Sequence, residues 1–212
     1  MNYAFTNGKI LNGTKDMKIQ EGLCILVQEE KITDIVPDTT DLHDYTVIDL
    51  HGHYILPGLI NMHVHLAGNG KPQKKQRDNE KLVNTIMGSS LIRAIAYNMV
   101  AGFARDELLS GVTTIRTVGG LGDFDTRLRD EIKAGKKVGP RILAANQGIS
   151  VPGGHMAGSV AIAAATTTDA LKHLEKSEKE NVDLIKLMIT GGVLDAKGKG
   201  VPGELKMAPE MV

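Results

Sequence analysis

The pattern of hydrophobic and polar residues changes once along this chain. Up to about residue 56, short β-branched stretches alternate with polar turns, which is the pattern of small β-sheets. This pattern predicts strands at 4–11, 22–28, 31–36 and 46–50. Beyond residue 56, apolar runs of strand length alternate with longer segments whose apolar residues recur every three to five positions. That second pattern predicts strands at 59–66, 112–118, 141–145 and 182–189, and helices at 82–109, 125–134 and 168–179, the last capped by Thr168 or Asp169.

This change of hydrophobic pattern predicts two domains, which we place at 1–56 and 57–212. The first is expected to be part of a small β-sandwich. In the second, strands that alternate with helices indicate βαβ units and a parallel sheet, either open or closed into a barrel. About four such units fit, so the expected fold class is α/β. The residues from 193 to 212 are expected to form a loop.

Composition narrows the class of protein. Lysine and arginine equal aspartate and glutamate at 25 each, so no basic field favours nucleic acid or an anionic membrane as a partner. A hydrophobic content of 42% is typical of a globular chain. Without an apolar run of about 18 residues, or a basic and apolar leader at the N-terminus, a cytoplasmic location is expected. The single cysteine, Cys24, lies in an apolar run and is expected to be a buried strand residue.

Two histidines carry the first chemical signal. His63 and His65 lie two residues apart in an apolar run that follows Pro57-Gly58. Side chains two apart on a strand point the same way, so the two imidazoles are expected side by side, with Met62, Val64 and Leu66 on the packed face. Imidazole is the commonest protein ligand for divalent metals, and this pair predicts half of a metal site.

Lys186 carries the second signal, because it interrupts an apolar strand that is expected to be buried on both faces. An unpaired buried lysine is costly. Its ammonium group could pair with a carboxylate such as Asp183, or extend outward to solvent. Alternatively, its neutral amine could react with carbon dioxide, and the resulting carbamate could bridge two metal ions.

A glycine-rich loop, 148–158, follows the predicted strand at 141–145. Function gathers at the carboxyl ends of parallel strands, and glycines allow a ligand to approach the backbone closely. Gly153, Gly154 and His155 are therefore the candidate substrate contacts, with a structural role for His155 as the alternative.

Together these residues resemble the amidohydrolase superfamily of metal-dependent hydrolases. The match includes 47–65, which is similar to the family's crossing from a β module into its first barrel strand, then 110–116, 183–186 and 190–193. The combination is most similar to the branch of Xaa-Pro dipeptidase-like and imidazolonepropionase-related enzymes.

The resemblance implies a partial TIM (β/α)8 barrel and an enzyme that hydrolyses an amide or peptide-like C–N bond with a metal-activated water. It implies that His63 and His65 hold one metal, most commonly zinc, and that a carboxylated Lys186 bridges it to a second. The expected partner is a small amide or dipeptide-like substrate. Two positions depart from the family pattern: Thr117 and Asn61 stand where relatives commonly have aspartate.

Family members have eight barrel strands and about twice this length. We therefore expect the sequence to correspond to the N-terminal half, truncated before the later metal ligands and the general base, so no catalytic residue is assigned here. Open sheet edges then predict a homo-oligomer or association that completes the barrel. Two rival hypotheses stay open: a catalytically silent chain that binds metal or a partner chain, and a mononuclear deaminase of the same superfamily, which Lys186 disfavours.

Overall fold

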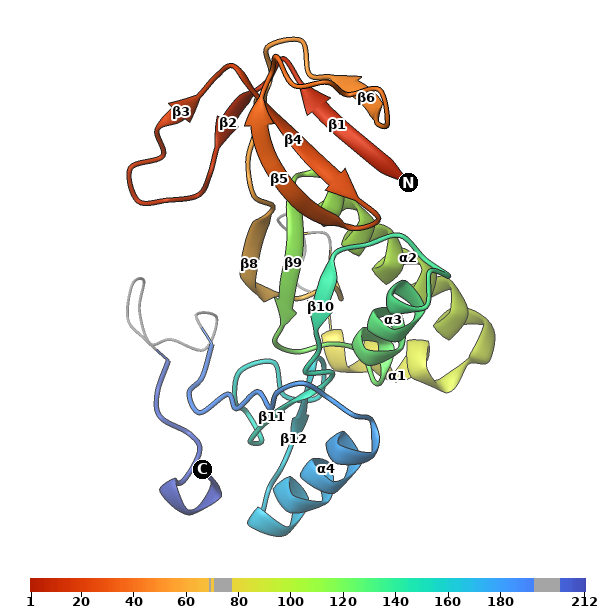
Figure 1. Ribbon diagram of the computed structural model, residues 1–212. Helices are drawn as coiled ribbons and strands as arrows, with labels where there is room; N and C mark the ends of the chain where they lie inside the picture. The colour runs from red at the N-terminus through yellow and green to blue at the C-terminus, as the bar shows by residue number, and fades with distance from the viewer. Residues whose placement is uncertain (69, 71–77, 193–202) are drawn as a thin grey trace. The chain divides into compact units, whose positions relative to one another are not determined.

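The computed structural model of the protein describes residues 1–68, 70, 78–192 and 203–212, and over these residues the fold is mixed α/β (Figure 1). The chain divides into two compact units, Met1–Gly58 and Leu59–Val212. This division lies two residues beyond the boundary expected from the hydrophobic pattern. Much of the expected C-terminal loop, residues 193–202, lies outside the described residues.

Two small sheets build the first unit. One has the strand order β5-β4-β1-β6 and the other has the order β3-β2-β7. The strands are β1 (Asn2–Thr6), β2 (Lys9–Leu11), β3 (Ile19–Gln20), β4 (Leu23–Gln28), β5 (Lys31–Pro37), β6 (Thr46–Asp49) and β7 (Tyr54–Ile55). The single strand expected at 4–11 is divided into β1 and β2, because Asn7 takes a left-handed conformation with φ of 52°. Cys24 is fully buried in β4, as its apolar surroundings predicted.

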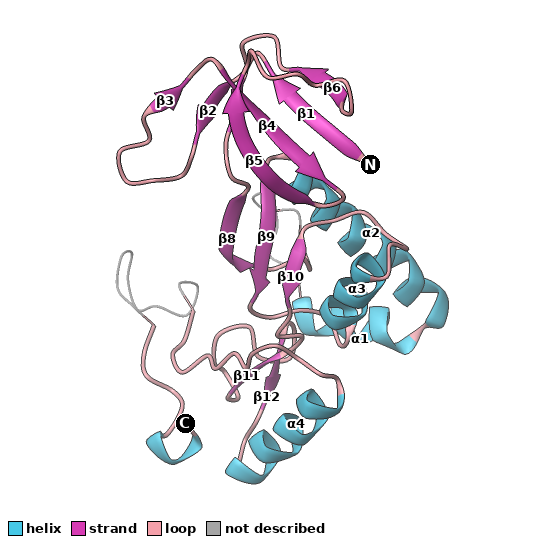
Figure 2. Cartoon of the chain, viewed as in Figure 1, coloured by secondary structure: helices cyan, strands magenta, loops and turns pink. Residues whose placement is uncertain are grey.

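A three-stranded parallel sheet organises the second unit, and its strands lie side by side in Figure 1 in the order β10-β9-β8. These strands are β8 (Leu59–Val64), β9 (Val112–Thr117) and β10 (Arg141–Leu143). Helices α1 (Asn79–Gly88), α2 (Ser90–Leu109) and α3 (Phe124–Lys133) connect them, and Figure 2 shows these helices gathered on one side of the sheet.

The prediction of one long helix at 82–109 is wrong in one respect, because the structure has two helices there. Ser89 is extended, with φ of −126° and ψ of 122°, and its hydroxyl accepts a hydrogen bond from the Ile92 amide. Serine caps helices readily because its oxygen satisfies a free amide of the first turn. Among the described residues no single helix is long and apolar enough to cross a membrane, and the pair α1–α2, bent by 113°, meets that test only as a pair.

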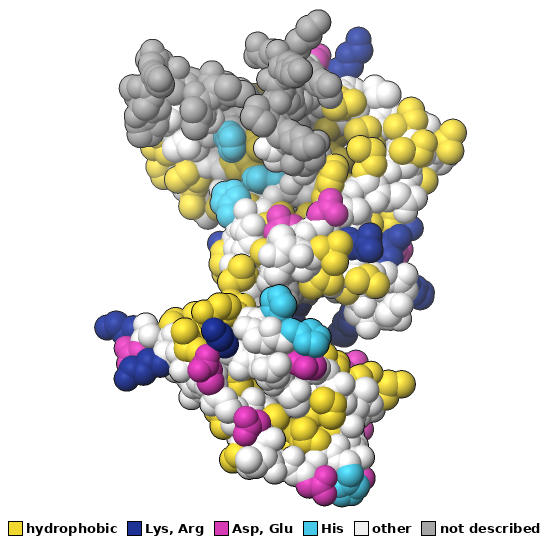
Figure 3. Space-filling view, turned by 90° about the horizontal axis from the view of Figure 1, so that it is seen from above, with side chains coloured by type: hydrophobic (Ala, Val, Ile, Leu, Met, Phe, Trp, Pro, Cys, Tyr) yellow, Lys and Arg dark blue, Asp and Glu magenta, His cyan; other side chains and the backbone are white. Residues whose placement is uncertain are grey.

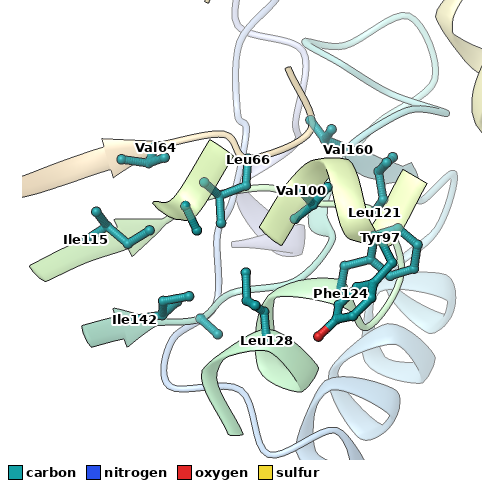
Figure 4. Packing of buried hydrophobic residues seen from close by; sticks show 12 residues of the cluster. Val64, Leu66, Tyr97, Val100, Ile115, Leu121, Phe124, Leu128, Ile142 and Val160 are labelled. Carbon is teal, nitrogen blue, oxygen red and sulfur yellow. The ribbon is translucent and has the colours of Figure 1, made fainter. Parts of the chain in front are cut away.

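The core of the second unit fills the space between this sheet and its helices. Val64, Ile115 and Ile142 project from the three strands toward Phe124 and Leu128 of α3, as Figure 4 shows. All five side chains are at most 7% exposed. Burial of one large apolar side chain contributes about 1.5–3 kcal/mol, so this cluster fixes the inward face of each strand. The opposite face of β8 and β9 is left for polar side chains.

The expected glycine-rich loop contains a strand. Residues Gly148–Ser150 form β11, which pairs in parallel with β12 (Ala161–Ala163). Helix α4 (Thr167–Lys179) follows. Its N-cap is Thr166, which corrects the expected cap at Thr168 or Asp169: Asp169 occupies the third helical position and completes a reciprocal capping box with Thr166.

The strand expected at 182–189 is reduced to an isolated parallel bridge between Ile149 and Leu187. The Ile149 amide donates to the Lys186 carbonyl at 2.8 Å, and the Met188 amide donates to the Ile149 carbonyl at 2.8 Å. Ahead of this bridge, the Asp183 amide donates to the Ala144 carbonyl at 2.8 Å. The Ala144 amide donates to the Asp183 carboxylate rather than to a backbone carbonyl, so no regular ladder forms there. Ile185 and Ile189 are 43% and 41% exposed, which corrects the expectation of burial on both faces.

Candidate metal centre

The end of β8 places His63 and His65 on one face. Val64 and Leu66 are 7% and 2% exposed and belong to the core, so the intervening histidines face away from it. The Val118 amide donates to the Val64 carbonyl at 3.1 Å and holds this segment to the neighbouring strand. Met62, expected on the packed face, is instead 47% exposed. The pairing of β8 with β9 shifts register between Asn61 and Val64, so the regular alternation of faces is interrupted at Met62.

The two imidazoles converge on one point. Their Nε2 atoms lie 3.3 Å apart, and the ring planes meet at 66°. Two imidazole nitrogens bound to the same tetrahedral zinc ion at about 2.0–2.1 Å lie about 3.3–3.4 Å apart. The observed separation fits two ligands of one metal ion, and in the metal-free chain it is also a hydrogen-bond distance between the two rings.

Gly119 orients His65. The Nδ1 atom of His65 lies 3.0 Å from the Gly119 carbonyl oxygen. Because a carbonyl only accepts, Nδ1 carries the proton and Nε2 keeps its lone pair, which is the arrangement that metal-binding histidines use. Gly119 has φ of 139°, and a β-carbon added there would lie 3.2 Å from two atoms of the imidazole. The sequence reasoning did not include Gly119 in the site, although a Gly-Gly pair after β9 was visible.

Four cationic or imidazole side chains surround His63. Burial lowers the pKa of His63, and the nearby charges of His65, Lys186, Arg116 and His155 lower it further. A lowered pKa keeps the imidazole neutral at physiological pH, which is the form that binds metal. The structure thus brings Lys186 and His155 near the two histidines, although they are distant in sequence.

Lys186 is half-buried beside β11. A β-carbon added to Gly148 would lie 3.2 Å from its Cγ atom, so the glycine makes room for the lysine stem. The suggested pairing of Lys186 with Asp183 is wrong, because the Asp183 carboxylate pairs with Arg129 at 2.8 Å and accepts from the Ala144 amide. Within the described ranges, no carboxylate lies within ion-pairing distance of the Lys186 ammonium group.

The glycine loop has a tightly packed centre. Gly154 is buried, its amide donates to the Val151 carbonyl at 2.8 Å, and an added β-carbon would lie 2.5 Å from Ser150 Oγ. Gly153 is exposed and its carbonyl accepts from Lys206. His155 is half-buried, and its ring lies where a β-carbon on Gly192 would be. Substrate contact by these three residues stays a prediction.

In the part of the chain that the structure describes, His, Cys, Asp and Glu form no group of three or more that could hold a metal ion. The two histidines, 3.3 Å apart at Nε2, stay candidate metal ligands, and Lys186 stays a further candidate. The sequence analysis missed Arg116. It lies between two buried residues of β9, so its side chain leaves the sheet on the same outward face as the histidine pair.

The described side chains show no single-sign surface in the view of Figure 3, where basic and acidic groups are interspersed. This distribution agrees with the equal number of basic and acidic residues in the sequence.

Comparisons with known proteins identify the family. The chain is 33% identical over 95 residues to a dihydroorotase of Bacillus thuringiensis (strain Al Hakam), which covers 45% of this chain and 21% of the dihydroorotase. A structure from Bifidobacterium longum assigned as a prolidase is 32% identical, with a TM-score of 0.70, over 93% of this chain and 43% of that one.

A Xaa-Pro dipeptidase with methionine bound in its active site is 28% identical, with a TM-score of 0.71, over 96% of this chain and 51% of that one. The chain thus spans about half the length of the solved structures that it matches, and about a fifth of the dihydroorotase. The sequence model of the Amidohydrolase family matches residues 54–204, most of the chain. This protein belongs to the amidohydrolase family.

Proposed function

We propose that this chain supplies a zinc-binding half-site to a hydrolase that cleaves an amide or peptide-like C–N bond. The observation that carries the proposal is the 3.3 Å separation of the His63 and His65 Nε2 atoms, together with the hydrogen bond that fixes the His65 lone pair. The relationship to dihydroorotases and to dipeptidase structures supports C–N hydrolysis and a small dipeptide-like substrate.

In this proposal His63 and His65 would hold one divalent ion, and a carboxylated Lys186 would be a ligand that it shares with a second. A bound ion of this kind lowers the pKa of a coordinated water and polarises a carbonyl oxygen. The protein's own residues would orient these ligands: burial and the nearby Arg116 guanidinium favour the unprotonated form of His63, and the Gly119 carbonyl fixes the tautomer of His65. In the same proposal His155, in the neighbouring loop, would contact the substrate.

We also propose a partial (β/α)8 barrel, which the parallel pairing of β8, β9 and β10 and the helices between them support. Association through the open edge of β8 stays a prediction, and exposed Leu59, Ile60 and Met62 on that strand support it.

Zinc binding to the purified chain tests the metal site. We expect the chain to bind zinc in competition with a chromogenic chelator, and His63→Asn or His65→Asn to weaken binding by at least about 100-fold, since even outer-shell changes cost 10–100-fold. His51→Asn, an exposed histidine of the first unit, is the matched control. Equal zinc affinity in the wild type and in the His63→Asn/His65→Asn double variant would contradict the proposal.

Hydrolysis is tested in the same preparations with dipeptide and N-acyl amino acid substrates. Release of amino acid that depends on His63, His65 and Lys186 supports the hydrolase. A chain that binds zinc without turnover favours the catalytically silent alternative, which the shortage of further ligands in the described residues supports. A single ion that survives Lys186→Gln, with release of ammonia from a ring amine, favours the deaminase.

A further inference from the structure

Asp125 has a buried carboxyl group without a hydrogen-bond partner. It lies in the first turn of α3, is 1% exposed, and neither of its carboxyl oxygens has a partner among the described residues. The neighbouring Thr117 hydroxyl is already engaged, because it donates to the Leu143 carbonyl and accepts from the Ala145 amide. Burial of a polar group without a partner costs free energy, and the cost is far larger for the ionised form.

No charged side chain of the described residues compensates this carboxyl group. Burial raises the pKa of Asp125 from 3.8 to about 6, the Thr117 hydroxyl lowers it in part, and no described charge contributes. The titratable groups of the surrounding elements are engaged or directed elsewhere: Arg116 on the outer face of β9, Asp123 with Arg93, Arg127 with Glu131, Arg129 with Asp130 and Asp183, Glu180 with Lys176, and His65 with the Gly119 carbonyl. Asp125 is therefore ionised without compensation at neutral pH.

The carboxyl group of Asp125 packs against the peptide group that joins Gly119 and Gly120. A β-carbon added to Gly120 would lie 2.5 Å from Oδ2 and 2.8 Å from Oδ1 of Asp125, so both oxygens cover the Gly120 α-carbon. The carbonyl oxygen of the same peptide group, that of Gly119, lies 3.0 Å from Nδ1 of His65. A peptide group is planar and moves as a unit. Asp125 and His65 therefore contact one rigid group.

Glycines on both sides allow this peptide group to turn. Gly119 has φ of 139°, and the absence of side chains at both positions leaves other orientations accessible. An ionised carboxylate is stabilised when water reaches it. Because Gly120 covers both oxygens of Asp125, a movement of this peptide group would admit water to the carboxylate.

We propose that Asp125 is a positioning residue for the metal site: its protonated carboxyl group holds the Gly119–Gly120 peptide with the carbonyl toward His65, and its ionisation releases that peptide. Once released, the carbonyl no longer fixes the proton on Nδ1, and His65 loses the orientation that presents Nε2 to a metal. This inference rests on the proposed function, because it treats His65 as a metal ligand. It adds that the zinc affinity of the site decreases as Asp125 ionises.

Zinc affinity at two pH values tests this role, measured by chelator competition at pH 5.0 and 7.5. At pH 5.0 the wild type and Asp125→Asn should bind zinc equally. At pH 7.5 Asp125→Asn, which cannot ionise, should bind zinc at least about tenfold more tightly than the wild type, since loss of an outer-shell partner costs 10–100-fold. Asp130→Asn is the matched control, because it removes an exposed carboxylate from the same helix and should follow the wild type. Equal affinity of the wild type and Asp125→Asn at pH 7.5 would overturn the proposal, as would weaker binding by the variant.

A metal-free measurement separates the role of Asp125 from zinc binding. The Gly120 amide resonance is followed by NMR from pH 5 to 8 in the His63→Asn/His65→Asn double variant, in which neither of these histidines titrates. We expect a transition with a midpoint near pH 6, and its loss when Asp125→Asn is added. Absence of zinc binding by the wild type at both pH values rejects the proposed function. A Gly120 resonance without this transition, or with the transition intact in Asp125→Asn, rejects the role of Asp125 alone.

Discussion

The Nδ1 atom of His65 lies 3.0 Å from the carbonyl oxygen of Gly119, so a backbone group of the loop after β9 orients a candidate ligand at the end of β8. The loop approaches this closely because Gly119 has no side chain. Its φ of 139° and the 3.2 Å distances from an added β-carbon to the His65 ring both oppose any other residue.

Gly119→Ala should therefore weaken zinc binding and destabilise the fold together. We expect a 10–100-fold loss of zinc affinity, because the displaced ring no longer has its tautomer fixed, and a decrease of about 1–3 kcal/mol in the free energy of unfolding from backbone strain. Chelator competition and urea unfolding measure the two effects. Gly102→Ala is the control: it lies in α2 with no atom within 4 Å of the added β-carbon, so alanine should stabilise by about 0.5–1 kcal/mol. Unchanged zinc affinity in Gly119→Ala would show that this contact does not orient the ligand.

The sequence predicts the histidine pair well because the relationship is local. Alternation along one strand sets which way His63 and His65 point, and buried Val64 fixes the face. The role of Gly119 depends instead on the approach of two segments 54 residues apart, which no local pattern specifies. The same holds for Arg116, because its Nε atom donates a hydrogen bond to the Met62 carbonyl on another strand.

The fold shows the same division between local and distant causes. The positions of β8, β9 and β10 follow from runs of apolar and β-branched residues. The break at Ser89 was missed because the apolar spacing continues across it, although the serine cap was present in the sequence. The stretch at 182–189 has the composition of a strand, but within it only Leu187 forms a bridge to β11. The Asp183 carboxylate instead accepts hydrogen bonds from Arg129 and from the Ala144 amide.

Asp183 should stabilise the fold at neutral pH. Burial raises the pKa of Asp183, but the Ala144 amide and the Arg129 guanidinium more than offset this, and the net pKa is lowered. Because the folded-state pKa lies below the unfolded value of 3.8, the stabilisation is present above about pH 4 and is lost as the pH falls further. Asp183→Ala should lower the free energy of unfolding by about 1–3 kcal/mol at pH 7, measured in urea, with a smaller difference at pH 3. A difference that stays the same at both pH values would rule out this ionic contribution.

The capping box of α4 should also contribute measurably. The Thr166 hydroxyl accepts from the Asp169 amide at 3.2 Å, and the Asp169 carboxylate accepts from the Thr166 amide at 3.0 Å. Thr166→Ala removes the first of these bonds and should destabilise the protein by about 1 kcal/mol in urea unfolding. Thr166→Asn, which supplies another capping oxygen, should recover most of the loss. If alanine and asparagine gave equal stability, the cap would contribute little.

Asp125 should have the opposite pH dependence from Asp183. It is 1% exposed in α3, and neither of its carboxyl oxygens has a hydrogen-bond partner among the described residues. The carboxyl group lies against Gly120, where an added β-carbon would be 2.5 Å from Oδ2. Burial raises the pKa of Asp125 from 3.8 to about 6, although the nearby Thr117 hydroxyl lowers it in part.

Since the folded-state pKa is the higher one, stability is greatest below about pH 4 and is lost as the pH rises through about 6. The difference between 3.8 and about 6 corresponds to about 3 kcal/mol. Asp125→Asn, which stays neutral, should therefore be more stable than the wild type at pH 7.5, by up to about this amount, and the advantage should vanish at pH 4. Asp130→Asn is the control on the same helix, because its carboxylate is exposed and pairs with Arg129. The free energy of unfolding in urea is compared for the three proteins across pH 4–8. If the wild type were as stable as Asp125→Asn at pH 7.5, the ionised carboxylate of Asp125 would have to be compensated in the folded state.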